Sequence, residues 1–199
     1  MITRKEMTRM LLKEGLLSWL ANNSFESVTV TSLCKASGIT RSTFYLHYSN
    51  IMEIVDDLVD DAIAYSKPGM VDNNNLQTIA NTLSAASNSV SLREAYDSIF
   101  DRLPLCQRII RHKKYLPLFL DEQISEYVLQ RIIRREKDRQ GLVMAEALGV
   151  SFDVGVSIFL FLVHGLYAVN KEYKWSQSDE WLEAQKIIFE LVYRGLQSR

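Results

Sequence analysis

Side chains that can recognise a nucleic acid lie close together in one short segment. Between residues 41 and 48 the chain carries a guanidinium, several hydroxyls and an imidazole, on Arg41, Ser42, Thr43, Tyr45 and His47. Groups of this kind donate hydrogen bonds to phosphates and to base edges in a major groove, and the fork of Arg41 matches the two acceptors of guanine. Thr43 and Tyr45 suit a phosphate or a thymine methyl group. These residues predict contacts with double-stranded DNA.

The same polar face has a simpler explanation. A polar side of an isolated eight-residue helix is more often merely solvated, because the general helix-turn-helix pattern is loose. The residues on either side of the segment distinguish DNA contact from simple solvation.

A tight turn precedes the segment. Gly38 adopts a positive φ without strain, Ile39 can fill the space between two helices, and Thr40 can cap the helix that follows. Before the turn, a short helix is expected to begin at Thr31 or Ser32, since either residue could cap it. Two short helices joined by a three-residue turn are what a DNA-binding helix-turn-helix requires.

The helix after the turn, expected over 41–48, has two distinct sides. Phe44 and Tyr48 are four residues apart and therefore share one side, with Leu33 and Ile39 as expected partners. This side of the helix is therefore predicted to pack in the hydrophobic core. The hydrogen-bonding groups lie on the other side and remain available to a ligand.

The elements that must hold these helices are expected to be helices as well. Apolar residues recur at spacings of three and four, which predicts an all-α fold. A first helix is expected over about 5–22, and a fourth over about 51–66, capped by Ser49 or Asn50. Further helices are expected over 76–90, 92–103, 105–114, 118–139, 151–173 and 178–197.

A domain boundary is expected near residue 67. Pro68-Gly69 and the asparagines at 73–75 favour turns and leave little to bury. The chain is therefore divided into an N-terminal three-helix helix-turn-helix domain with its connecting helix, residues 1–66, and a C-terminal helical domain, residues 67–199.

Charge is distributed unevenly along the first domain. Residues 1–50 hold six basic and three acidic side chains, a net charge of +3, whereas residues 51–66 hold five acidic and no basic ones. A polyanion would therefore meet the first segment, with the acidic helix pointing away. The net charge of −1 for the whole chain excludes a protein whose entire surface binds nucleic acid.

Other bulk features favour a cytoplasmic protein without a cofactor. The charged N-terminus lacks the apolar stretch of a secretory signal, and no run of apolar residues reaches the roughly 18 that a membrane span needs. Cys34 and Cys106 match no metal-binding spacing, so reduced and buried thiols are expected. The histidines are isolated from other ligands, and no catalytic or nucleotide-binding motif is present, so neither a metal site nor an enzyme is expected.

The stretch from Phe25 to Val55 resembles the tetracycline-repressor family of bacterial transcription regulators. The matching features are Thr29-Val30 before the second helix, Leu33 followed by the small Cys34, the Ala36 to Ile39 turn, and Thr43-Phe44-Tyr45-Leu46-His47-Tyr48. The last of these matches the family's Thr-aromatic-Tyr-x-His-aromatic pattern. Chain length and an all-helical remainder agree, although beyond residue 66 only the architecture is similar.

The resemblance implies a homodimer that binds a palindromic operator and is released when a small-molecule effector binds the C-terminal domain. It implies DNA contacts from the recognition helix and from Thr29 and Thr31 at the start of the second helix. Two positions depart from the family: Ile51 stands where a phosphate-binding Lys is common, and Ser24 stands where Gly is usual. The loss of the lysine predicts weaker binding to DNA unless Lys5, Arg9 or Lys35 supplies the missing charge.

An effector site and a dimer interface have only general candidates. Aromatic and imidazole side chains that could line an effector site are Tyr96, Phe100, Tyr115, Phe119, Tyr127, Phe159, His164 and Tyr167, although aromatic residues at helical spacing are more often core. The helix 151–173 is apolar nearly all round, which predicts that it is buried. A hydrogen-bonded core or interface position is therefore favoured for His164 over a contact with an effector. Covering that helix favours a four-helix dimer interface from 151–173 and 178–197 of two chains; the alternative is a monomer core built from the same residues.

Two other features have competing explanations. Five basic residues between 131 and 139 could form a second anion site, but a solvated helix end explains them more simply. The acidic helix and Ile51 leave open a second function, in which a helix-turn-helix protein acts as a co-activator or adaptor through a protein partner. The leading expectation is a repressor that binds an operator.

Overall fold

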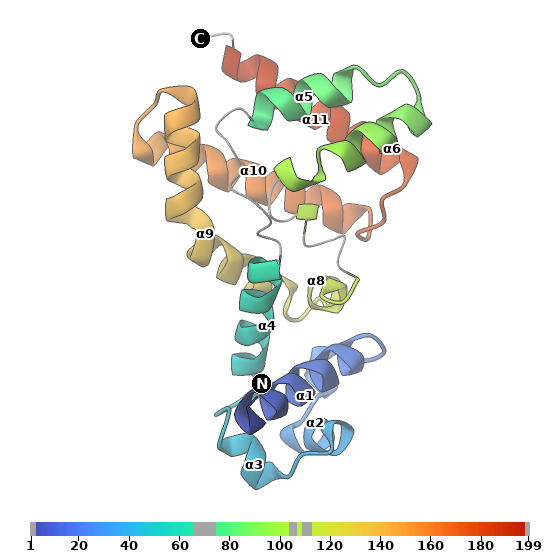
Figure 1. The fold of residues 1–199 in the computed structure, drawn as a ribbon, viewed down its shortest axis with the longest axis vertical. Coiled ribbons are helices and arrows are strands. Elements are labelled where there is room, and N and C mark those ends of the chain that lie inside the picture. The colour runs from blue at the N-terminus through green and yellow to red at the C-terminus, as the bar shows by residue number, and fades with distance from the viewer. Residues whose placement is uncertain (1–2, 66–74, 104–106, 109–112, 198–199) are drawn as a thin grey trace. The chain divides into compact units, whose positions relative to one another are not determined.

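The computed structural model describes residues 3–65, 75–103, 107–108 and 113–197 (Figure 1). All regular secondary structure in these ranges is helical, so the predicted all-α class is confirmed. The chain packs as two compact units: Met1–Tyr65 with His112–Arg134, and Ser66–Arg111 with Arg135–Arg199. This grouping differs from the predicted division in residues 112–134, which pack with the N-terminal helices.

The first unit is built around α1. Its elements are α1 (Arg4–Leu20), η1 (Phe25–Ser27), α2 (Val30–Ser37), α3 (Arg41–Tyr45), α4 (Ile51–Tyr65), α8 (Leu116–Leu120) and the first part of α9 (Ser125–Leu148). α1 contacts α2, α4 and α8. Fully buried side chains from successive helices meet in its core, among them Leu12, Leu16, Leu33, Phe44, Ile54 and Leu58. Burying such side chains is the main driving force that holds short helices in place.

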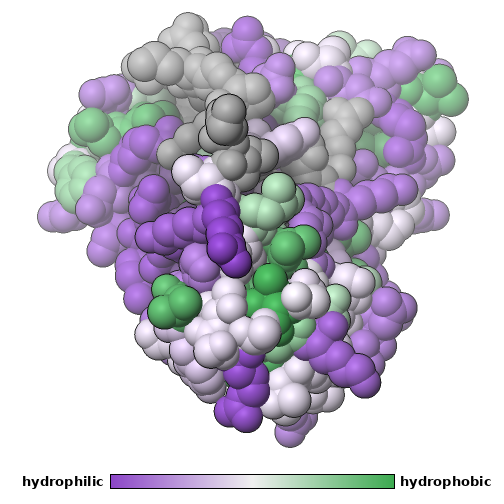
Figure 2. Space-filling view, turned by 60° about the horizontal axis from the view of Figure 1, so that its bottom comes forward, coloured by the Kyte–Doolittle hydropathy of each residue, from purple (hydrophilic) through white to green (hydrophobic). Residues whose placement is uncertain are grey.

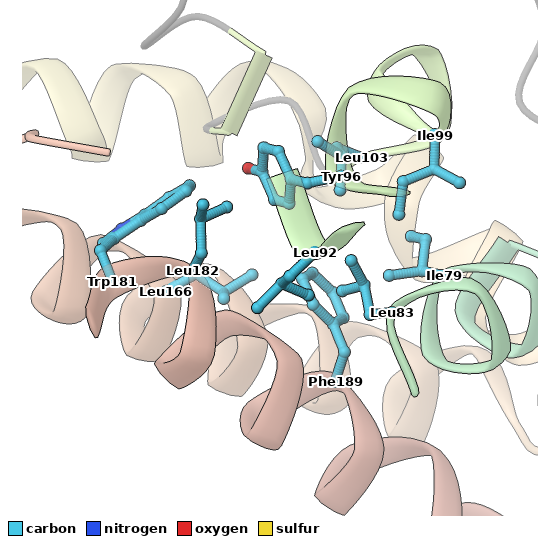
Figure 3. Packing of buried hydrophobic residues seen from close by; sticks show 10 residues of the cluster. All are labelled: Ile79, Leu83, Leu92, Tyr96, Ile99, Leu103, Leu166, Trp181, Leu182 and Phe189. Carbon is cyan, nitrogen blue, oxygen red and sulfur yellow. The ribbon is translucent and has the colours of Figure 1, made fainter. Parts of the chain in front are cut away.

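The second unit packs α5 and α6 against α11. Its elements are α5 (Asn75–Ser84), α6 (Ser89–Ser98), η2 (Phe100–Arg102), the rest of α9, α10 (Phe152–Glu172) and α11 (Asp179–Gln197). Figure 3 shows the core between them, where Trp181, Leu182 and Phe189 of α11 face side chains of α5 and α6. Leu166 of α10 joins the same cluster.

Several helix boundaries differ from the predictions. The first helix ends at Leu20, not Asn22. The helix expected over 76–90 ends at Ser84, because Asn88 caps a new helix at Ser89 in a reciprocal pair with Ser91. Polar capping of this kind satisfies amide groups that a longer helix would have bonded itself.

The C-terminal half of the chain shows further differences. The expected helix 92–103 is divided into α6 and the single turn η2. The expected helix 118–139 is replaced by α8 and by α9, which continues to Leu148. The side chain of Asp121 separates these two helices by accepting hydrogen bonds from the amides of Gln123 and Ile124. The helix expected over 105–114 falls mostly outside the described residues.

α10 corrects one prediction. By length and composition this helix is apolar enough to cross a membrane, although polar residues interrupt it and core helices of soluble proteins have the same character. The expected burial on all sides is wrong for the single chain, because Phe161 is 74% exposed and His164 is exposed as well. His164 is therefore not a core residue of one chain.

Candidate nucleic-acid interface

Thr29 fixes the start of α2. Its hydroxyl accepts a hydrogen bond from the amide of Ser32 at 3.0 Å, and the Ser32 hydroxyl accepts one from the amide of Thr29 at 2.9 Å. This reciprocal capping starts the helix at Val30, so the predicted caps Thr31 and Ser32 are wrong. Thr29 and Thr31 are both exposed at the start of the helix.

The turn between α2 and α3 has the predicted geometry. Gly38 ends α2 with a φ of 66°, in the left-handed region that favours glycine. The amide of Ile39 then donates to the carbonyl of Cys34 at 2.9 Å. Thr40 caps α3 by accepting from the amide of Thr43 at 3.2 Å, as expected. The backbone of the turn is thus fixed at both ends by local hydrogen bonds.

α3 presents one buried and one exposed side. Phe44 and Tyr48 are buried, as predicted from their spacing. The helix ends at Tyr45 and continues as a turn, in which the amides of His47 and Tyr48 both donate to the carbonyl of Phe44. Of the predicted contact residues, Arg41, Ser42 and Tyr45 are exposed, whereas Thr43 and His47 are partly buried. Figure 2 brings the bottom of the view of Figure 1 forward and shows hydrophilic, weakly polar and hydrophobic side chains next to one another on that face.

The sequence analysis missed Leu46 at this surface. Leu46 follows Tyr45 directly, and its side chain is 80% exposed. Its position could have been inferred, because Phe44 and Tyr48 are each two residues away and so lie on the opposite side of the helix. Leu46 has no hydrogen-bonding group and therefore does not belong to the polar pattern of residues 41–47.

A polar network holds the end of α3 against α1 and α4. The Tyr48 hydroxyl donates to Asp57 of α4 at 2.6 Å and accepts from Arg9 Nε of α1 at 3.2 Å. Arg9 also pairs with Asp57, and its guanidinium lies 4.9 Å from the centre of the Tyr48 ring. Burial and the hydrogen bond to Asp57 raise the pKa of Tyr48 far above its ordinary value, so the hydroxyl keeps its proton.

The acidic side chains of α4 face cations from two other helices. Asp57 and Asp61 pair with Arg9 and Lys13 of α1. On α9, Arg131 lies 3.1 Å from a carboxylate oxygen of Asp60. A fourth acid, Asp56, accepts a hydrogen bond from the Tyr127 hydroxyl at 2.7 Å. Four of the five acids between residues 51 and 66 therefore have partners within the protein and are not simply solvated.

Some of the basic residues of α9 have partners within the protein. Arg131 faces α4, and Arg139 pairs with Glu136, whose side chain is buried. The four basic residues other than Arg131, which are Arg134, Arg135, Lys137 and Arg139, are exposed as the simpler explanation expects, but they do not lie at a helix end, because α9 continues to Leu148. At the start of α4, Ile51 is partly buried and adds no charge to the surface.

The predicted effector residues belong to both units. Tyr115, Phe119 and Tyr127 belong to the first unit, whereas the second unit holds Tyr96, Phe100, Phe159, His164 and Tyr167. Within the second unit, the rings of Tyr96 and Trp181 lie 5.2 Å apart, as do those of Tyr167 and Trp175.

A buried polar chain crosses the core of the second unit. The Tyr96 hydroxyl donates to Gln107 at 3.2 Å, and the Gln107 amide donates to Gln185 of α11 at 2.9 Å. Nearby in the sequence of α11, Trp181 donates to the buried Asn170 of α10 at 2.9 Å. The amide oxygens of Asn170 and Gln185 each accept a hydrogen bond in this way, whereas their amide nitrogens are buried without a partner among the described residues.

Among the described residues, no three His, Cys, Asp or Glu side chains gather in a way that could hold a metal ion. No protein-family model, curated protein or solved structure matches the chain significantly.

Proposed function

We propose that the chain is a transcription regulator that binds double-stranded DNA through α3, with α2 contributing from its start. The observation that carries this proposal is the two-sided build of α3: Phe44 and Tyr48 are buried, and Arg41, Ser42 and Tyr45 are exposed beside them. A short helix fixed in this way can enter a major groove without losing much conformational freedom on binding. The resemblance of residues 25–55 to the tetracycline-repressor family supports the same function.

The pairing of the acidic helix favours this function. The carboxylates of Asp57 and Asp61 are neutralised by α1, and Asp60 is neutralised by Arg131 of α9. Their repulsion of a phosphate backbone is therefore reduced. Between residues 3 and 50, the same unit has exposed cations at Arg4, Lys5, Lys35 and Arg41.

The direct test uses purified protein and the DNA upstream of its own gene. Fluorescence anisotropy should show specific binding whose affinity falls roughly a thousandfold between 50 and 200 mM salt if about six phosphates are contacted. A scrambled duplex of the same composition is the control. Equal affinity for both duplexes at every salt concentration would contradict the proposal, and a footprint would locate the operator.

A homodimer and an effector belong to the same proposal. Large apolar side chains on α10 and α11 remain exposed in the single chain: Phe161 (74%), Leu191 (67%) and Ile187 (50%). A second copy of α10 and α11 would cover them and would place two α3 helices on a palindrome. In this proposal the protein is a cytoplasmic repressor, and a small molecule bound by the second unit releases it from DNA.

The second candidate function is that of a co-activator or adaptor. It is favoured by Ile51, which adds no cation where one would meet phosphate, and by the exposed apolar Leu46. The chain would then fail to shift its upstream DNA at low salt and would be recovered with a stoichiometric protein partner. Specific DNA binding without such a partner would remove this candidate.

A further inference from the structure

We infer that Leu46 reads a thymine methyl group in the major groove, and that it is a specificity-determining residue of this chain. The inference rests on the proposed DNA-binding function and assigns a base to a side chain that lacks any hydrogen-bonding group. It begins from exposure: at 80%, Leu46 is the most exposed of the large hydrophobic side chains among the described residues.

The direction of Leu46 is set by its place on the helical turn. It adopts right-handed helical backbone angles at the end of α3, with φ −73° and ψ −18°. At about 100° per residue it lies roughly 160° around the helix from both Phe44 and Tyr48. Because those two side chains define the buried side, Leu46 marks the centre of the side that faces away from the core.

The neighbours of Leu46 leave it room to make contact. Ser42, one turn earlier on the same side, is short and exposed, so it does not cover the leucine. Tyr45 is 53% exposed, and its ring packs edge-on against Phe44 at 5.2 Å. A helix that docked with this side would bring Leu46 to the groove floor between polar neighbours.

The chemistry of the groove then selects the base. In the major groove guanine, adenine and cytosine present acceptors and donors, whereas thymine also presents the C5-methyl group. A leucine that covers a donor or acceptor leaves it unsatisfied, which is unfavourable. Contact with a methyl group is favourable because both apolar surfaces leave water. Thymine is therefore the base that suits Leu46.

The test removes only the methyl group. The full-length protein selects its preferred duplexes from a random pool, and each thymine of the selected site is replaced singly by deoxyuridine. At one thymine per half-site the affinity should fall about fourfold, the factor expected for burying one methyl group. Replacing both symmetry-related thymines should lower it roughly fifteenfold.

Variants of the protein assign the effect to the residue. With Leu46→Ala the affinities for the thymine and uracil sites should become equal at that position, whereas Leu46→Met should restore most of the difference. Val90→Ala, a change at another exposed apolar side chain, should leave the ratio unchanged. Because Leu46 is so exposed, Leu46→Ala should unfold at the wild-type temperature, which a thermal melt verifies.

The outcomes separate the inference from the function it rests on. A selected site in which no thymine responds to deoxyuridine overturns the inference but leaves DNA binding intact. A thymine effect that persists in Leu46→Ala also overturns the inference. A folded Leu46→Ala protein that does not bind at all overturns it too, because the loss of one methyl contact cannot explain a complete loss of binding. A random pool that yields no preferred sequence overturns both.

Discussion

Arg41 stands in the first turn of α3, exposed and beside the short side chain of Ser42. If its fork pairs with a guanine, Arg41→Ala should lower the affinity by about 1–3 kcal/mol and relax the preference at one base pair. Anisotropy titrations against duplexes with each base at that position would measure it. Arg41→Lys keeps the charge and should lose most of the base preference but less of the affinity.

Arg41 and Tyr45 together decide whether α3 is the reading helix. Both side chains are exposed, so their replacement should leave the fold intact. Specific binding that survives the double change Arg41→Ala with Tyr45→Ala would rule out this helix as the reader.

The hydroxyl of Tyr48 makes a second prediction at the scale of one residue. It bridges Asp57 and Arg9, so Tyr48→Phe should lower the free energy of unfolding by about 1 kcal/mol. Urea denaturation at neutral pH measures the change. The matched control is Tyr45→Phe, since the Tyr45 side chain is 53% exposed at the end of α3 and its loss of a hydroxyl should be nearly neutral. Equal effects of the two changes would contradict the assigned role of the network.

Single residues show how far the sequence can be interpreted. The four-residue spacing of Phe44 and Tyr48 predicted their burial correctly, because helical periodicity is a local property. The cap of α2 was assigned wrongly to Thr31 or Ser32, since several adjacent hydroxyls can cap a helix and the choice depends on which residue leaves helical geometry. Leu46 has no hydrogen-bonding group, so a pattern of polar side chains does not include it.

At the scale of elements, α9 and α10 approach so closely that their glycines are required. A Cβ added at Gly155 would lie 2.3 Å from the carbonyl oxygen of Gly141 and 2.7 Å from the amide nitrogen of Ala145. Both neighbours are backbone atoms, so the helices themselves would have to separate. Gly155→Ala should therefore lower the free energy of unfolding by at least about 1 kcal/mol, in the range of overpacked cores.

Gly195 provides the control for that change. It lies in α11 with nothing within 4 Å of an added Cβ, so Gly195→Ala should be neutral or stabilising by up to about 1 kcal/mol. Chemical denaturation of both variants compares them directly. A Gly155→Ala protein as stable as the Gly195→Ala protein would show that the close approach of the helices is not required.

The pairing of charged elements could not be predicted from the sequence. The five acids of residues 51–66 form one block, which indicates a solvated helix by local pattern. Their partners Arg9 and Arg131 lie 48 and 71 residues away along the chain. Only the tertiary fold brings such groups within 4 Å, so local charge counts identify the helix but not what it faces.

At the scale of the whole molecule, the helical class was predicted with success, because periodicity recurs in nearly every segment. The grouping of residues 112–134 with the N-terminal helices was not predicted. That grouping depends on contacts such as the bond from the amide of Phe25 to Asp121, which no local pattern contains. Most residues of the proposed interface lie in one short segment, so the sequence alone could suggest them, whereas the eight effector candidates lie in two units.

The exposed apolar side chains of α10 and α11 lead to a prediction for the assembly. If a second copy covers them, Phe161→Glu combined with Leu191→Glu should convert a dimer into a folded monomer, because buried carboxylates would oppose association. Sedimentation velocity at micromolar concentration measures the mass. Val90→Glu, at a side chain that is 68% exposed on α6, is the control and should leave the dimer unchanged.

The exposed apolar side chains of α10 and α11 could be covered by a second copy of the chain or by a lipid surface, and the wild-type protein and the double variant together distinguish the two. α10 has the hydropathy of a membrane span, so the wild-type protein should be tested for flotation with liposomes in parallel. A wild-type protein that stays dimeric in buffer and does not float supports the four-helix interface, and its monomeric variant should bind a palindromic operator far more weakly than the wild type, since each half-site then binds on its own. A wild-type protein that is monomeric at all concentrations, or that floats with lipid, would contradict the dimer and would require another explanation for the apolar surface of α10.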